Sequence, residues 1–145
     1  MITVKQILDE KGSKVWTIGP EAKVLDALKL MAEKEVGALV VMTGDEVVGI
    51  LSERDYARKV VLLGRQSQDT PVRDIMTAEV YGVHADTTAD ECMALMTDKR
   101  IRHLPVCKDG KLAGVISIGD VVKAIIGHQK GTIENLENYI MGKYQ

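Results

Sequence analysis

Two kinds of hydrophobic pattern alternate along the chain. Residues 22–34 are apolar at the three-to-four-residue spacing of one helix face, at Val24, Ala27, Leu28 and Met31. Residues 38–42 and 47–51 are short apolar runs typical of strands, and the polar turn between them predicts a hairpin. A short β run at 15–18 precedes these elements, and a helix is expected from Ser52 onward. The predicted order is therefore β-α-β-β-α.

The same order is written a second time, displaced by 65 positions, the separation of Gly49 and Gly114. Residues 20–59 align with residues 85–124 without a gap, and the phrase GILSERD, which begins at Gly49, returns as GVISIGD. A repeated unit of this kind cannot bury its apolar sheet face alone. We therefore expect an α/β (α+β) fold in which two β-α-β-β-α copies pack sheet to sheet about a pseudo-twofold axis.

The repeat divides the chain into four segments. We expect a first repeat with an N-terminal helix at 1–63, a linker at 64–71, a second repeat at 72–128 and a C-terminal helix at 129–145. Within the linker, Thr70-Pro71 is typical of a cap followed by the first residue of a helix. The C-terminal helix carries an apolar stripe that needs a partner surface, made of Ile133, Leu136, Ile140 and Met141.

Composition and charge narrow the range of partners. Of the 145 residues, 46% are hydrophobic, with one Trp, four Tyr and no Phe, so the core must be aliphatic. The net charge of −2 and the lack of a basic block argue against nucleic acid. No apolar run is long enough for a bilayer and the N-terminus does not resemble a signal peptide, so a cytoplasmic protein without a membrane partner is expected. Cys92 and Cys107 lack a CxxC partner and are expected to be reduced, buried thiols.

Motifs of the common catalytic classes are missing. The chain has no P-loop lysine, no GxSxG, no HExxH and no GxGxxG after a strand. No second His or acid lies at metal-ligand spacing from His103, and His84 and His128 are expected at the surface. We therefore expect no metal, no catalytic cofactor and no enzyme. An enzyme, either a small α/β hydrolase or a nucleotide hydrolase, is the competing hypothesis, and turnover assays on nucleotides would decide it.

The repeated Ser-x-x-Asp before each second helix has two physical explanations. As a capping box, Ser52 and Ser117 accept hydrogen bonds from the backbone N–H of Asp55 and Asp120, whose carboxylates reach back to the Ser N–H. As a ligand site, the helix N-terminus attracts a phosphate group and the carboxylate accepts both hydroxyls of a ribose. The same residues can serve both purposes.

The duplicated G-h-h-S-x-x-D motif, in phase with the same order of elements, resembles a tandem CBS-domain pair, or Bateman module, in a stand-alone protein. Leu104-Pro105-Val106 and the ERD at Glu53–Asp55 add to this resemblance, which covers nearly the whole chain. It implies a non-catalytic regulatory sensor that binds an adenosine-containing ligand (AMP, ADP, ATP, NAD or S-adenosylmethionine) in a cleft between the repeats. It also implies a disk-like homodimer and an unidentified regulated protein.

The resemblance further implies the residues of the site. Asp55 and Asp120 would hold ribose, and Ser52 and Ser117 would lie beside phosphate. The other candidate ligand contacts are Thr17, Ile18, Gly37, Ala38, Arg54, Tyr81, Val83, Arg102, His103, Ile118 and Gly119.

The two copies are not equivalent. The second copy has Arg102-His103 where the first has Gly37-Ala38, and Glu53 adds a negative charge at the helix end of the first copy. We therefore expect the second copy to hold the tighter site. Arg102 as a plain surface residue and His103 as a buried, hydrogen-bonded side chain remain alternatives. So does a structural or dimerisation module with empty clefts, in which Ser-x-x-Asp only caps helices.

Overall fold

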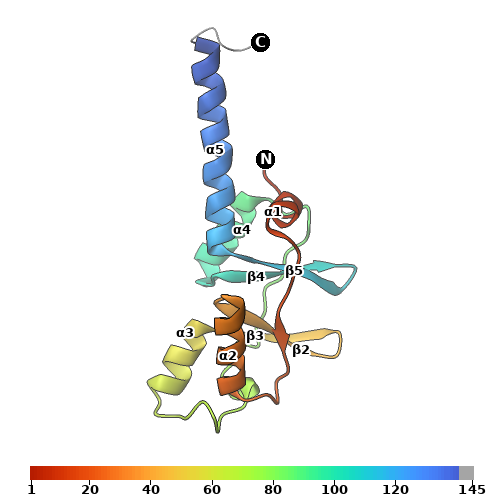
Figure 1. The fold of residues 1–145 in the computed structure, drawn as a ribbon. Coiled ribbons are helices and arrows are strands. Elements are labelled where there is room, and N and C mark those ends of the chain that lie inside the picture. Colours follow the sequence, from red (N-terminus) through yellow and green to blue (C-terminus); the bar gives the residue numbers. More distant parts are fainter. Residues whose placement is uncertain (141–145) are drawn as a thin grey trace.

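The structure is a computed structural model that describes residues 1–140, with side chains described through residue 131. Its two halves are stacked with their sheets facing each other and their helices outside (Figure 1). The elements of the first half are β1 Thr17–Ile18, α2 Val24–Lys34, β2 Ala38–Thr43, β3 Glu46–Ser52 and α3 Glu53–Tyr56, continued by a π-helix at Ala57–Val61. Those of the second half are α4 Ala89–Lys99, β4 His103–Lys108, β5 Lys111–Ser117 and α5 Ile118–Ile140. The α1 helix Val4–Lys11 precedes the first half and a 3-10 helix Val72–Asp74 precedes the second.

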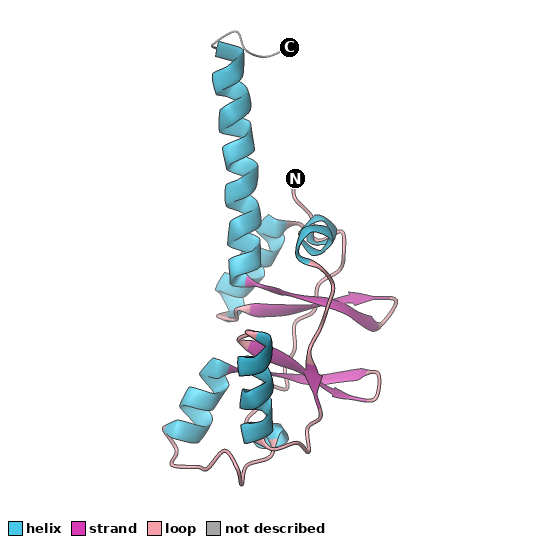
Figure 2. Ribbon diagram, in the orientation of Figure 1, coloured by secondary structure: helices cyan, strands magenta, loops and turns pink. Residues whose placement is uncertain are grey.

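The two sheets share one plan, which confirms the predicted mixed fold. In the first half, β1 runs parallel to β2, and β2 pairs with β3 in an antiparallel hairpin (Figure 2). In the second half, the β4–β5 hairpin has the same register, with the irregularity after Val106 matching that after Val41. The first strand of the second half is shorter than expected, because it consists of a single parallel bridge between Val83 and Val106.

The segment before each half packs into the core of the other half. Val4 and Ile7 of α1 are buried with Leu104 and Ile116 of the second half. Val72 and Ile75, which lie in or just after the 3-10 helix, are buried with Leu39 and Leu51 of the first half. Each leading segment thus covers a sheet that is distant in sequence, and α1 joins the second core although it precedes the first repeat. This exchange holds the two halves together through buried apolar surface.

The repeated glycines follow from this exchange. A Cβ at Gly114 would lie 2.9 Å from Cδ2 of Leu8, and a Cβ at Gly49 would lie 2.7 Å from Sδ of Met76. Because the leading segment crosses the second strand of each hairpin at this point, a side chain would crowd Met76 and the Thr77 carbonyl oxygen in the first half and Leu8 in the second. The first letter of the repeated phrase is therefore a packing requirement.

The expected helix cap at Thr70-Pro71 in the linker is wrong, and the expected apolar stripe of the C-terminal helix falls outside the residues whose side chains are described. Thr70 does not cap a helix, because its hydroxyl donates to the Gln66 carbonyl oxygen at 2.8 Å. Pro71 precedes the short 3-10 helix as its N-cap instead of starting an α-helix, and its extended backbone pairs with Lys23. The backbone of α5 continues well beyond the body of the molecule (Figure 1), but the stripe named for it lies outside the residues whose side chains are described.

The cysteines differ from each other. Both are free thiols, but Cys92 is fully buried whereas Cys107 is only half-buried, so the expectation of two buried thiols is wrong for Cys107. Burial, with a smaller contribution from Glu91, raises the pKa of Cys92 to about 11. Among the described residues, none of the helices has both the length and the apolar character that a membrane crossing requires.

Candidate functional site

Two pockets of similar size lie between the halves, each with a cavity volume of about 430 Å³. We name them by the carboxylate that each contains. The Asp55 pocket is lined by Gly37, Ile50, Ser52, Glu53, Arg54, Asp55, Arg58, Lys59, Thr77, Glu79, Val80, Tyr81, Arg100, Ile101, Arg102 and His103. The Asp120 pocket is lined by Lys11, Lys14, Val15, Trp16, Glu35, Val36, Gly37, Ala38, Leu39, Val40, Ile50, His103, Val115, Ser117 and Asp120. Both volumes lie in the range of small-molecule sites.

Each pocket combines the carboxylate of one half with the first strand region and the hairpin entrance of the other half. Arg102 lines the pocket of Asp55 and does not line that of Asp120, which faces Gly37 and Ala38 instead. The expected grouping of Arg102 with Asp120 is therefore wrong. The physical reason is the pseudo-twofold stacking, which brings the end of β3 beside the start of β4. The expectation that the second copy holds the tighter site assumed that Arg102 lies beside Asp120, so it no longer has that support.

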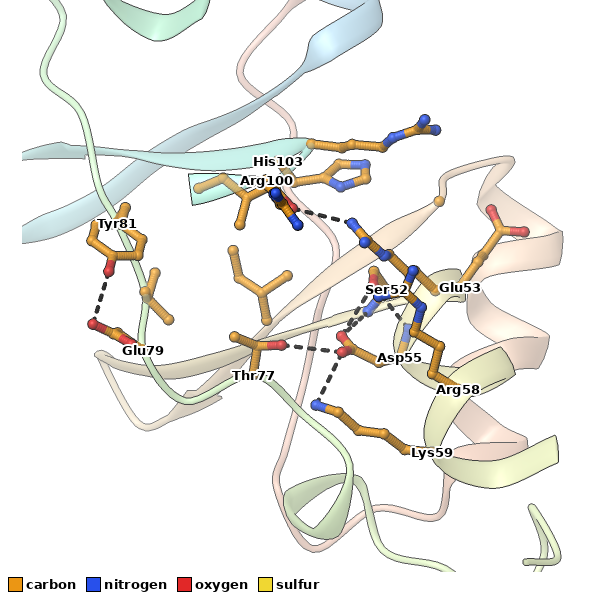
Figure 3. A pocket seen from close by; sticks show the side chains of 16 residues that line it. Ser52, Glu53, Asp55, Arg58, Lys59, Thr77, Glu79, Tyr81, Arg100 and His103 are labelled. Carbon is orange, nitrogen blue, oxygen red and sulfur yellow. Dashed lines mark hydrogen bonds and ion pairs between the residues drawn. The ribbon is translucent and has the colours of Figure 1, made fainter. Parts of the chain in front are cut away.

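Asp55 is buried, and protein groups already use all of its acceptor capacity (Figure 3). Its Oδ2 accepts from the backbone N–H and the hydroxyl of Ser52, each at 3.0 Å. Its Oδ1 accepts from the Thr77 hydroxyl at 3.1 Å and pairs with Lys59 Nζ at 3.2 Å. A carboxylate offers about four lone-pair positions. The capping box is thus present, and any ligand that bonds to Asp55 must displace one of these partners.

Positive side chains surround this pocket. Five of its lining residues are cationic, namely Arg54, Arg58, Lys59, Arg100 and Arg102. Three are acidic, namely Glu53, Asp55 and Glu79. The cations come from both halves, and Arg54 links them by donating from Nη1 to the Arg100 carbonyl oxygen at 3.1 Å. Figure 3 shows Arg100 and His103 facing Asp55 and Lys59 across the pocket. An excess of two positive charges, with His103 taken as neutral, makes the pocket attractive to anions.

Asp120 has different hydrogen-bonding partners, and only one of its two carboxylate oxygens is bonded to them. Oδ2 accepts from the Ser117 backbone N–H at 2.8 Å and from Lys11 Nζ at 2.5 Å. Lys11, the last residue of α1, also donates to the Val115 carbonyl oxygen at 2.7 Å. Within the described part of the chain, Oδ1 has no hydrogen-bonding partner. Burial raises the pKa of Asp120, but the hydrogen bonds from Lys11 and Ser117 and the Lys11 charge outweigh it, so the net pKa lies below 3.8.

His103 belongs to the wall that separates the two pockets, because it lines both of them together with Gly37 and Ile50. Burial lowers the pKa of His103, and the charges of Lys11 and Arg102 lower it further against the opposing effect of Asp120. The imidazole is therefore mainly neutral at pH 7. Its side chain is half-buried, which falls short of the buried, hydrogen-bonded histidine that the alternative expected.

The helix N-termini offer fewer free donors than the sequence motif suggests. The N–H of Glu53 donates to the Gly37 carbonyl oxygen at 3.1 Å, and the N–H of Asp55 donates to the Ser52 hydroxyl at 3.2 Å. In the other half, the N–H of Ile118 bonds to Arg102 and that of Asp120 to Ser117. Charge recognition in these pockets therefore depends mainly on side-chain cations.

Five of the predicted contacts line neither pocket. Val83 is buried in the second core, and Ile118 packs against that core from outside. Ile18 packs against the first core, while Thr17 and Gly119 are exposed. Sequence reasoning also missed several lining residues, namely Lys11, Trp16, Lys59, Thr77 and Arg100. Trp16 could have been found from the sequence, because the repeat aligns it with the predicted contact Tyr81. Lys11 and Thr77 could not, because they reach Asp120 and Asp55 only through the exchange of leading segments.

Among residues 1–131, no three His, Cys, Asp or Glu side chains gather as metal ligands would. No buried polar side-chain atom within that same part of the chain lacks a hydrogen bond.

Comparisons with known proteins agree with the fold. The family model of the CBS domain matches residues 2–62 and 72–127. The mitochondrial CBS domain-containing protein CBSX3 of Arabidopsis thaliana is 41% identical over 98% of this chain and 73% of its own length. A putative signal-transduction protein with CBS domains from Burkholderia ambifaria is 55% identical with a TM-score of 0.84, over 88% of this chain and 96% of that one.

A more distant solved structure contains ligands. The CBS domain pair of protein MJ0100, in complex with 5′-methylthioadenosine and S-adenosyl-L-methionine, has a TM-score of 0.78 at 22% identity, covering 88% of this chain and 98% of that one. At this identity the likeness concerns the fold alone. The two matched segments, the duplicated hairpin and the stacked sheets lead to one conclusion: the chain belongs to the CBS domain family and is a tandem pair of CBS repeats.

Proposed function

We propose that this chain is a non-catalytic regulatory module that binds a phosphate-bearing adenosine ligand, such as AMP, ADP, ATP or NAD, in the Asp55 pocket. CBS domain pairs are in general regulatory modules without catalysis of their own. The MJ0100 pair, which shares the fold, was solved with two adenosine compounds. The adenosine group of the ligand is therefore supported by a structural relative, whereas its phosphate and the choice of pocket are supported by the charges of this chain.

The observation that carries the proposal is the set of five cations around the Asp55 pocket, contributed by both halves. Phosphate oxygens would pair with Arg100 and Arg102 from the second half and with Arg54 and Arg58 from the first. Since charge-assisted hydrogen bonds are about twice as strong as neutral ones, these pairs would supply much of the affinity. A ligand that bridges both halves binds best to one relative orientation of them, which is the physical basis of a sensor.

The remaining parts of an adenine nucleotide also have candidate partners. Ile50, Val80 and Ile101 provide apolar walls for a purine, and the Tyr81 ring lies in the same wall. Lys59 is 41% exposed, so it can leave Asp55 and pair with a phosphate. The exchange frees one acceptor position of Oδ1, beside the Thr77 hydroxyl, for a ribose hydroxyl, in line with the ribose role that the resemblance implies. Asp120 is not required for this ligand.

Calorimetric titration of AMP, ADP, ATP and NAD tests this proposal. We expect at least one of them to bind the unmodified chain and to lose tenfold or more in affinity in Arg102→Ala. Arg65→Ala is the matched control, because Arg65 is an exposed arginine that lines neither pocket. At 100 times its dissociation constant, the ligand should stabilise the chain by about 2.7 kcal/mol. Equal losses in the two variants, or no binding of any adenosine compound, would refute the proposal.

A second measurement addresses catalysis. The nucleotide that binds is incubated with the chain, and product is quantified over hours at saturating concentration. We expect recovery of the unchanged nucleotide, because the pocket contains no residue set of a known hydrolytic class. Turnover that disappears in Asp55→Asn would instead make the module an enzyme.

A separate observation favours self-association as a second part of the function. Val61, Leu62 and Leu63 are consecutive, apolar and exposed by 56%, 75% and 67% at the end of the π-helix. An exposed apolar run of this kind often marks a protein–protein contact. We expect a homodimer in sedimentation experiments that dissociates in Leu62→Lys/Leu63→Lys. An Ile126→Lys variant, which changes another exposed apolar residue, is the control.

A further inference from the structure

The two pockets are related by the repeat, but their charges are not. The position that carries Arg100 in the Asp55 pocket carries Glu35 in the Asp120 pocket. The position that carries Arg102 is Gly37 in the equivalent place. Two lysines of the Asp120 pocket, Lys11 and Lys14, are balanced by two carboxylates, so this pocket has no net charge. The Asp55 pocket has an excess of two positive charges.

The two carboxylates also differ in how many acceptor positions they have free, and here the Asp120 pocket has the advantage. All four lone-pair positions of Asp55 are used by protein groups. Asp120 keeps Oδ1 without a partner in the part of the chain that the structure describes. Its neighbour Lys11 bonds to Oδ2 and neutralises the charge of the carboxylate, while leaving Oδ1 open to a donor such as a sugar hydroxyl. The pocket that is poor in cations is therefore the one with a carboxylate ready for a diol.

The walls of the Asp120 pocket suit an uncharged ring. Trp16 lies in it together with aliphatic residues from the first strand region and the second strand, such as Val15 and Val40. Indole and aliphatic surfaces gain from contact with a purine, which presents an apolar face of its own. No arginine lines this pocket, so a phosphate group would meet only Lys11, which is paired with Asp120, and Lys14, whose Nζ lies 5.3 Å from the centre of the Trp16 ring.

We propose that the two pockets take different classes of ligand: the Asp120 pocket binds a nucleoside without phosphate, through its ribose diol and its base, while phosphate-bearing ligands bind in the Asp55 pocket. This inference rests on the proposed function, because both classes share the adenosine group. It makes the module a comparator of two ligands. Since Gly37, Ile50 and His103 line both pockets, occupancy of one alters the wall of the other.

The only tryptophan of the chain is a reporter for one pocket. Trp16 lines the Asp120 pocket and not the Asp55 pocket, so its fluorescence distinguishes the two sites. The probes are adenosine and ATP, titrated separately while Trp16 emission and heat are recorded. We expect adenosine to change the emission and to bind at least tenfold more weakly to Asp120→Asn than to the unmodified chain. Asp9→Asn is the matched control, because Asp9 is an exposed aspartate of α1 that lines neither pocket, and it should leave adenosine binding within threefold.

ATP should give heat without direct contact at Trp16. Any emission change that ATP causes should vanish in Arg102→Ala, since it would come from the Asp55 pocket through the shared wall. A saturable ATP response that survives Arg102→Ala with an affinity equal to that of adenosine would overturn the division of ligands, while leaving the proposed function intact. Failure of both probes to bind by calorimetry would overturn both proposals together.

A variant that gains ATP binding in the Asp120 pocket provides a further test, because a gain in affinity cannot result from a loss of stability. Glu35 and Arg100 have the same left-handed backbone, with φ of 55° at each, so Glu35→Arg places an arginine where the fold already accepts one. We expect this variant to acquire an ATP response at Trp16 that is at least tenfold tighter than in the unmodified chain. Glu33→Arg makes the same charge change at an exposed residue outside both pockets and should have no such effect. Equal responses in the two variants would refute a role for the missing cation.

Discussion

The crossing of the leading segments over the hairpins can be tested by adding one methyl group to each half. In Gly49→Ala, the new Cβ would lie 2.7 Å from Sδ and 3.0 Å from Cγ of Met76, and 3.0 Å from the Thr77 carbonyl oxygen. In Gly114→Ala, the nearest atoms would all belong to the side chain of Leu8, with its two methyl groups at 2.9 and 3.1 Å and its Cγ at 3.6 Å. The tip of a leucine can rotate away, but a backbone carbonyl cannot.

The carbonyl in question is also hydrogen-bonded. Thr77 and Ile50 exchange two backbone hydrogen bonds, with the Ile50 N–H donating at 2.9 Å and the Thr77 N–H at 2.8 Å. Overpacking a core typically costs about 1–3 kcal/mol, and weakening each hydrogen bond adds up to about 1 kcal/mol. Replacing Gly recovers about 0.4–1 kcal/mol through the unfolded state. We therefore expect Gly49→Ala to lose about 2–3 kcal/mol and Gly114→Ala no more than about 1 kcal/mol.

Equilibrium unfolding in urea measures both variants. With m values of about 1–3 kcal/mol/M, a difference of about 2 kcal/mol between them separates the midpoints by about 1 M, at unchanged m. A double-mutant cycle of Gly49→Ala with Met76→Ala should show a favourable coupling of about 0.5–1 kcal/mol or more, since these residues are in contact. Equal losses in the two glycine variants, or a Gly49→Ala as stable as the unmodified chain, would refute this account of the repeated glycine.

Three further predictions follow from the described contacts. Because the pKa of Asp120 lies below 3.8, its stabilising effect is present above that pH and is lost as the pH falls through the folded pKa. Lys11→Met should therefore lose up to about 1 kcal/mol at pH 7, and urea titrations should show the gap to the unmodified chain closing under acid conditions. A Lys11→Met chain that is less stable by the same amount at every pH would contradict this. Burial holds the pKa of Cys92 at about 11, so a thiol reagent at pH 8 should modify Cys107 first and Cys92 only at the rate of unfolding; equal rates in the native chain would argue against it. Thr88 caps α4 whereas Lys23 offers α2 no side-chain cap, so Thr88→Ala should cost about 1 kcal/mol and Lys23→Thr should gain a comparable amount in thermal unfolding. A more stable Thr88→Ala and a less stable Lys23→Thr would show that these cap positions do not stabilise the helices.

The sequence by itself determined the elements and their duplication. Hairpins, helix faces and Ser-x-x-Asp caps depend on residues a few positions apart, so the patterns at 22–34 and 38–51 predict the α2 helix and the β2–β3 hairpin closely. The buried residues at these positions, such as Leu39 and Leu51, follow from the same local period. The duplication then implied that two such units pack sheet to sheet, but the structure gives each half a core of its own.

Only the tertiary structure decided which side chains share a pocket. Lys11 and Asp120 meet across 109 positions of sequence, and Arg54 reaches the carbonyl of Arg100 across 46. These pairs arise from the stacking of the sheets and from the exchange of leading segments, which no local period encodes. Contacts between distant segments depend on how whole elements dock. For that reason Arg102 could be recognised in the sequence as a candidate, but its location beside Asp55 could not.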